Sequence, residues 1–126
     1  MANKSYRKGY QFERQIFHLF QSAGFYCVRS AGSHGTFDIV AIKNAIAFGI
    51  QCKYNNHLTP AEKMAMLNAY KQFGIIPLYA HRTKGKPLII KCLLDDSIIK
   101  PEELYKLPEK YKSSQLKHFI KLNGEG

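Results

Sequence analysis

Three residues with metal-binding or charged side chains interrupt two otherwise apolar segments of the chain. Asp38 stands near the start of an apolar run that extends to residue 42, and Gln51 and Lys53 close a second run that begins at residue 45. Side chains two residues apart on a β-strand point to the same face of a sheet. Gln51 and Lys53 would therefore share a face, and Asp38 on a neighbouring antiparallel strand could meet them. Such a group suits a divalent metal ion and a phosphate.

Two roles fit this arrangement. In the first, a metal ion held by Asp38 polarises a phosphodiester and lowers the pKa of a bound water, while Lys53 orients that water or balances charge on the pentavalent phosphate. Glu13 can supply a second carboxylate, and the Gln51 side-chain oxygen and the Cys52 backbone carbonyl are neutral ligand candidates. In the second role, Asp38 and Lys53 form a structural ion pair at the strand ends. Spacing alone leaves both roles open.

Apolar periodicity and capping signals predict the elements that position these residues. A capping box at residues 59–62 should start a helix that Gly74 ends. The resulting order, α-β-β-β-α-β-β, predicts an α/β fold with a mixed central β-sheet flanked by helices, and the nearly continuous apolar strands predict cover on both faces. The expected helices span residues 5–23 and 60–73, and the expected strands span residues 25–30, 37–42, 45–54, 75–81 and 87–94.

The length of 126 residues suits a single domain over residues 1–126. We expect its core within residues 5–94, followed by an extension over residues 95–126 with short helices near 101–106 and 112–121. Three cysteines without C-x-x-C spacing argue against a disulfide framework and a zinc ribbon. No apolar stretch reaches the roughly 18 residues of a membrane span. The polar, basic start lacks the apolar region of a signal peptide, so we expect a cytoplasmic protein without a membrane partner.

The net charge of +10 is concentrated in the first 94 residues. This part holds thirteen lysines and arginines but only three acids, Glu13, Asp38 and Glu62, whereas the remaining residues are balanced. Such a surface attracts a polyanion through counterion release and long-range steering. A surface that binds nucleic acid disfavours carboxylates by repulsion. The acids retained in the motif-like segments, Glu13 and Asp38, therefore indicate a bound cation.

Four ordered blocks carry a resemblance to a known family. They are KGYQFER at residues 8–14, GFYCVRSAGS at residues 24–33, DIVA at residues 38–41 and QCK at residues 51–53. Together they resemble the archaeal Holliday junction resolvases, which are restriction-endonuclease-like nucleases with the PD-(D/E)xK motif. A weaker likeness continues through residues 73–77. The family usually has glutamate where this chain has Gln51, and the motif has proline where it has Phe37.

The resemblance implies a restriction-endonuclease-like fold and a Mg²⁺-dependent endodeoxyribonuclease that resolves four-way DNA junctions by paired incisions as a homodimer. Mn²⁺ should be able to replace Mg²⁺. Glu13 and Asp38 would hold the metal, Gln51 would be a weaker ligand, and Lys53 would be catalytic. Ser33 would lie in a loop that approaches the scissile strand and join the catalytic group. The candidate DNA contacts are Arg7, Lys8, Arg14, Arg29, Ser30, Ser33, His34, Tyr54, Lys84 and Lys86.

Gln51 also leaves other functions open, because an amide removes one negative charge from the metal site. A catalytically weak or inactive protein of the same fold could bind branched DNA without cutting it, and a related restriction or repair nuclease is a third option. Some of the candidate DNA contacts could instead have a purely structural role or be exposed without a function. His34 could be an exposed loop residue, Tyr54 could pack at a strand end, and Lys84 and Lys86 could belong to a solvated turn.

Overall fold

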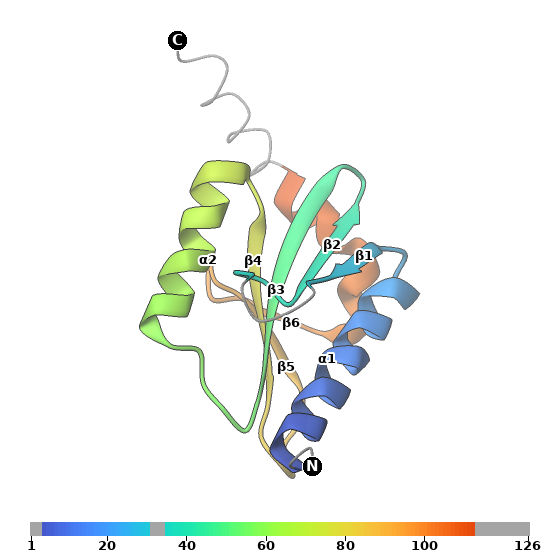
Figure 1. Cartoon of the computed structure of the whole chain (residues 1–126). Coiled ribbons are helices and arrows are strands. Elements are labelled where there is room, and N and C mark those ends of the chain that lie inside the picture. The colour runs from blue at the N-terminus through green and yellow to red at the C-terminus, as the bar shows by residue number, and fades with distance from the viewer. Residues whose placement is uncertain (1–3, 31–34, 113–126) are drawn as a thin grey trace.

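The computed structural model describes residues 4–30 and 35–112, apart from the side chains of residues 4–6 (Figure 1). The predicted order of elements is confirmed through the fifth strand, and a two-residue sixth strand follows. None of the helices in these residues is long and apolar enough to cross a membrane. The elements are α1 (Lys4–Ser22), β1 (Tyr26–Arg29), β2 (Ile39–Lys43), β3 (Ile46–Tyr54), α2 (Pro60–Phe73), β4 (Ile76–Arg82), β5 (Ile89–Cys92), β6 (Ile98–Ile99) and the 3-10 helix η1 (Pro101–Lys106).

The strands form a single mixed sheet in the spatial order β1-β2-β3-β4-β5-β6. Neighbouring strands are antiparallel except β3 and β4, which are parallel. A parallel pair needs a crossover connection, and α2 provides it. Because β3 and β4 run in the same direction, their carboxyl ends lie at one end of the sheet, where Lys53 pairs in register with His81.

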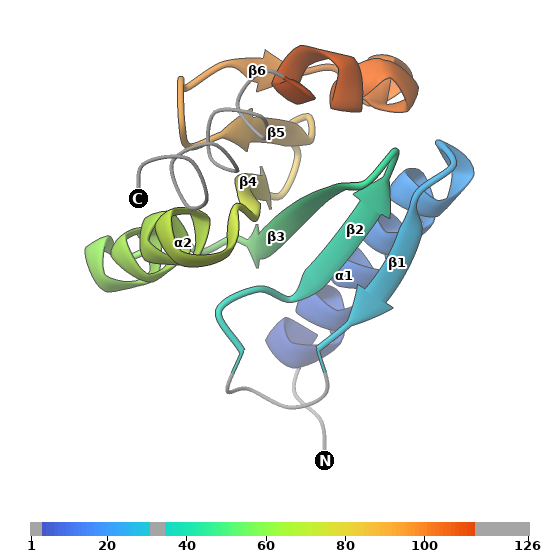
Figure 2. The same ribbon diagram turned by 90° about the horizontal axis from the view of Figure 1, so that it is seen from above.

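Helices cover both faces of this sheet, as the apolar strands predicted. Figure 2 shows α1 and α2 on opposite sides of it. Along β3, Ile46, Phe48 and Ile50 are buried in the main core with α1. A smaller cluster built on Phe37, Met66 and Ala69 lies beneath α2. The two faces of β3 therefore have different roles, one in the core and one toward α2.

The core extends past residue 94, where we expected it to end. Leu104, Leu107 and Tyr111 are buried in the main cluster, and residues 107–112 are helical after η1. The Lys43 ammonium also donates hydrogen bonds to the carbonyls of Ala23 and Tyr105, both at 2.8 Å. The short helix expected near residues 101–106 is present as η1. The one expected over residues 112–121 falls almost wholly outside the described residues.

The capping box predicted for α2 is present. The Thr59 hydroxyl accepts a hydrogen bond from the Glu62 N–H at 3.1 Å, and Glu62 Oε1 accepts one from the Thr59 N–H at 2.9 Å. Gly74 adopts the left-handed conformation after the helix (φ 74°), and its N–H donates to the Tyr70 carbonyl. Both ends of α2 are thus set by local sequence, and the amino-terminal end places Glu62 against the sheet.

The Phe37 ring packs directly on the backbone of Gly49. A Cβ atom at position 49 would lie 2.5 Å from ring carbons of Phe37. The ring is buried with Met66 and Ala69, so it has little room to retreat. Asp38 follows directly, and its N–H donates to the Ile50 carbonyl at 2.9 Å. Because Gly49 has no side chain, the Phe37 ring can pack closely against β3 at the position immediately before Asp38.

We predict that Gly49→Ala destabilises the protein by about 1–3 kcal/mol, the typical effect of overpacking a core. Gly9→Ala is a suitable control, because nothing lies within 4 Å of a Cβ there and α1 continues through the position. That change should stabilise the protein by about 0.5–1 kcal/mol through helix propensity. Urea unfolding of both variants measures the difference. Equal effects of the two substitutions would contradict the packing role of Gly49.

Candidate active site

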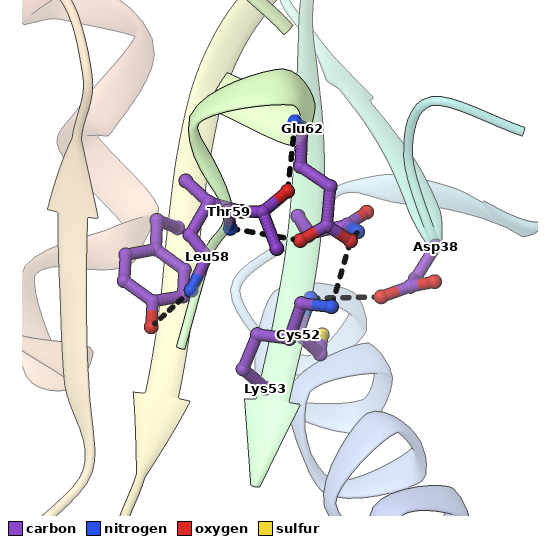
Figure 3. Close-up of polar contacts among 8 residues, drawn as sticks. Asp38, Cys52, Lys53, Leu58, Thr59 and Glu62 are labelled. Atoms are coloured by element: carbon purple, nitrogen blue, oxygen red, sulfur yellow. Dashed lines mark hydrogen bonds and ion pairs between the residues drawn. The ribbon is translucent and has the colours of Figure 1, made fainter. Parts of the chain in front are cut away.

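Asp38 lies just before β2, and its carboxylate is held by the end of β3. The Cys52 N–H donates a hydrogen bond to Asp38 Oδ2 at 2.8 Å (Figure 3). Burial raises the pKa of Asp38, and the Cys52 hydrogen bond and the Lys53 charge offset this only in part. Asp38 forms no ion pair with any of the described residues. A partly desolvated carboxylate without a direct cationic partner is a favourable place for a bound cation.

Lys53 pairs with Glu62 rather than with Asp38. Its Nζ lies 2.7 Å from Glu62 Oε2, and both side chains are partly exposed. The alternative of a structural ion pair between Asp38 and Lys53 is therefore wrong in the described structure. The ammonium still lies close enough to Asp38 to lower the pKa of that carboxyl. Lys53 is thus held beside Asp38 by a third residue.

Gln51 also contacts the Glu62 carboxylate, through its amide nitrogen and not through its oxygen. Its Nε2 donates to Glu62 Oε2 at 3.0 Å, and the residue is only 9% exposed. In the part of the chain that the structure describes, Gln51 Oε1 has no hydrogen-bond partner. Only the amide nitrogen can donate to a carboxylate, so this contact fixes which end of the amide faces Glu62.

Glu62 is the site residue that the sequence analysis missed, since it assigned this glutamate to the helix cap alone. Burial raises the pKa of Glu62, but the Lys53 hydrogen bond and the bonds from Thr59 outweigh that effect and lower it to about 2. These contacts therefore add stability above the ordinary pKa of 4.5, and the gain is lost as pH falls toward 2. A signal existed in the sequence: Glu62 is the third acid of the basic region of the first 94 residues.

Glu13 reaches this end of the sheet from α1. Both Arg29 Nε and a terminal guanidinium nitrogen lie 3.0 Å from Glu13 Oε1, and the Arg29 guanidinium lies 4.9 Å from the centre of the Tyr10 ring. Burial raises the pKa of Glu13, and the charge of Asp38 adds to this while Arg29 opposes it. Asp38 is therefore coupled electrostatically to Glu13 as well as to Lys53.

The oxygen donors suit a metal ion held by one carboxylate and neutral groups. Across residues 4–30 and 35–112, no three side chains of His, Cys, Asp or Glu lie close enough to share an ion. A centre here would combine Asp38 with Gln51 Oε1, the Cys52 carbonyl and water, with Glu13 as a further carboxylate. An unpaired buried polar group costs about 1–3 kcal/mol. A cation would satisfy the Gln51 oxygen, so the oxygen donors present are compatible with a divalent metal ion.

Three of the expected DNA contacts, Tyr54, Lys84 and Lys86, lie on the carboxyl-end side of the sheet. Lys84 and Lys86 are exposed in the turn after β4, and the Lys84 N–H donates to Asn55 Oδ1 at 2.8 Å. Tyr54 packs its ring against Phe12, with the ring centres 6.0 Å apart, as the strand-end interpretation expected. A cavity of about 290 Å³ opens beside it, lined by Lys8, Gln11, Phe12, Gln15, Tyr54 and Arg82.

The remaining candidates lie on α1, at the end of β1 and in the loop that follows β1. Arg7 and Arg14 are exposed on α1. Arg29 is engaged by Glu13, and the Ser30 N–H donates to the Asp38 carbonyl at 2.9 Å. Ser33 and His34 lie outside the described residues.

Comparisons with known proteins identify the family and the fold of this chain. The family model described as archaeal Holliday junction resolvase (Hjc) matches residues 4–124. A crossover junction endodeoxyribonuclease, Hjc of Methanocaldococcus jannaschii, is 30% identical over 93 residues, which cover 71% of this chain and 69% of that protein. The solved structure of Hjc from Archaeoglobus fulgidus, a Holliday junction resolvase, covers 83% of this chain and 96% of its own, with a TM-score of 0.60 and 21% identity, and shows the shared fold. The chain therefore belongs to the archaeal Holliday junction resolvase family, Hjc.

Proposed function

We propose that this protein is a Mg²⁺-dependent endodeoxyribonuclease that resolves four-way DNA junctions by paired incisions as a homodimer. One observation carries the proposal, namely the grouping of three side chains at this end of the sheet. Among the described residues, Asp38 is partly buried without an ion-pair partner, and the Gln51 oxygen has no hydrogen-bond partner. The third member of the group is the ammonium of Lys53. Membership of the Hjc family supplies the substrate class.

Each of these side chains has a chemical task in the proposed reaction. Asp38, Gln51 Oε1 and the Cys52 carbonyl would hold Mg²⁺, or Mn²⁺ in its place, with Glu13 as a second carboxylate. When bound, the ion would polarise the phosphodiester and lower the pKa of an attacking water. Lys53 donates hydrogen bonds to the attacking water or to a phosphate oxygen and balances the negative charge that develops there. Arg29 limits the repulsion that Glu13 exerts on DNA by pairing with it.

The charge distribution supports recognition of DNA by shape and phosphate contacts rather than by bases. The three acids of the first 94 residues lie at or beside the proposed centre, whereas Lys8, Arg82, Lys84 and Lys86 lie on the surrounding elements. A four-way junction offers two symmetrically related strands for cleavage, and a two-fold dimer would present two equivalent centres to them. Because the substrate is DNA, we also expect the protein to act in the cytoplasm.

A second candidate function is favoured by Gln51. Carboxylates dominate Mg²⁺ binding, so an amide at this position weakens the charge that attracts the ion. A protein with this centre could bind branched DNA without cutting it. Incubation with a synthetic four-way junction and Mg²⁺ separates the two functions, and a duplex of the same sequence as competitor tests for a restriction or repair nuclease.

We predict that Asp38→Asn abolishes junction cleavage while junction binding persists. Mutation of a residue that only supports a metal ligand typically lowers activity by roughly 10–100-fold. Asp38 would bind the metal directly, so the loss of cleavage should be larger than this. Removal of a negative charge from the DNA side should not weaken DNA binding. Cleavage is measured by single-turnover assays with Mg²⁺, and binding by gel shift with the metal chelated.

Asp96→Asn is the matched control for this change, because Asp96 is exposed, pairs with Lys91 and lies beyond β5 at the other end of the sheet. It should cleave like the wild type. If the wild type gives no paired incisions at any of several salt concentrations, the nuclease proposal fails and the binding function replaces it.

We also predict that Lys84→Gln and Lys86→Gln each lower the salt dependence of junction binding. Each phosphate contact contributes roughly 0.9 to the slope of log affinity against log salt concentration. Lys71→Gln, in the last turn of α2, is the control and should leave the slope unchanged. Titrations by fluorescence anisotropy at several salt concentrations give the slopes, and identical slopes for all three variants would exclude this turn from the DNA-binding surface.

A further inference from the structure

Glu62 makes two separate sets of contacts with its two oxygens. Oε1 accepts the N–H of Thr59 and completes the capping box. Oε2 accepts hydrogen bonds from Gln51 Nε2 at 3.0 Å and from Lys53 Nζ at 2.7 Å. The helix cap accounts for the first oxygen only. The second oxygen faces two side chains of the proposed centre, so it needs an explanation of its own.

The contact with Gln51 determines what that side chain can offer to a metal ion. An amide presents an oxygen at one end and a hydrogen-bond donor at the other. Because Nε2 is directed to Glu62, Oε1 is directed away from it and stays without a hydrogen-bond partner among the described residues, in a residue that is only 9% exposed. Without Glu62 the amide could turn and present its NH₂ group to a cation instead, which would oppose metal binding.

The contact with Lys53 concerns the charge of the centre. Gln51 stands where the resemblance to the family expects a glutamate, so β3 lacks one negative charge. Glu62 supplies a carboxylate in contact with this residue, from a helix instead of the strand. It also neutralises the ammonium of Lys53, which would otherwise repel a metal ion held by Asp38.

We propose that Glu62 is a positioning residue of the metal centre, which orients the Gln51 amide for metal binding and replaces the carboxylate that β3 lacks. The inference rests on the proposed function, because it requires a divalent ion at Asp38 and Gln51. It goes beyond that function in assigning a role to a residue of α2 that lies outside the four sequence blocks of the family. It also implies that Gln51 and Glu62 act as one unit.

The test is Mg²⁺ binding to the intact protein without DNA, measured by titration calorimetry. Glu62→Gln deletes the charge but keeps the side-chain length, and glutamine is still accepted in a capping box. We expect it to weaken Mg²⁺ binding by about 10–100-fold, the usual effect of removing a group that orients a metal ligand. The exchange variant Gln51→Glu/Glu62→Gln returns the charge to β3 and keeps an amide opposite a carboxylate. It should recover most of the lost affinity.

Thr59→Ala separates this role from the helix cap. It removes the hydroxyl that caps α2, yet it keeps the backbone N–H that binds Glu62. It should lower the melting temperature and leave Mg²⁺ affinity unchanged. Melting temperatures of all variants show whether each one is folded under the conditions of the titration.

Three results in the variants would overturn the inference. They are wild-type affinity in Glu62→Gln, an exchange variant that binds Mg²⁺ as weakly as Glu62→Gln, and an equal loss of affinity in Thr59→Ala. If the wild type binds Mg²⁺ and Glu62→Gln binds it equally well, the proposed nuclease centre stands and only the role of Glu62 falls. If the wild type binds no Mg²⁺, the metal centre itself is disproved along with the role of Glu62.

Discussion

The alternation of side chains along β3 is the constraint on which the core and the site both depend. One set of alternate residues, including Phe48 and Ile50, is fully buried in the core with α1. The other set meets Phe37 at Gly49 and Glu62 at Gln51 and Lys53. A shift of one residue in the pairing of β3 would exchange these faces. The same register that buries the core therefore also presents the amide and the ammonium to α2.

Much of this arrangement follows from local sequence rules. The period of two placed Gln51 and Lys53 on one face, and the antiparallel pairing of β2 with β3 brought Asp38 to the Cys52 N–H. The capping box correctly set the start of α2. Local rules could not give the partner of Lys53, because Glu62 meets it only after the chain has crossed a loop and begun a helix. The choice between Asp38 and Glu62 as partner is made by tertiary geometry.

The same limit explains the carboxyl-terminal part of the core. Leu104, Leu107 and Tyr111 are separated by charged residues and look like part of a solvated segment, although their spacing follows a helical repeat. Their burial depends on space left beside α1 and the sheet, which no local pattern specifies. The distribution of charges could be interpreted from the sequence more reliably than the extent of the core. Two of the three acids in the basic part of the chain form ion pairs, Glu13 with Arg29 and Glu62 with Lys53. For the third, Asp38, burial raises the pKa and the charge of Lys53 opposes this.

The double attachment of Glu62 has a consequence for how such centres change over evolutionary time. Helix capping gives selection a reason to retain this glutamate for folding alone, whatever the strand carries. A lineage that keeps it already has a carboxylate touching position 51, so loss of a charge from the strand need not pass through a form without one. A motif search that requires a glutamate at the position of Gln51 would overlook carboxylates that a helix supplies instead. Comparison of side-chain positions in space would find them.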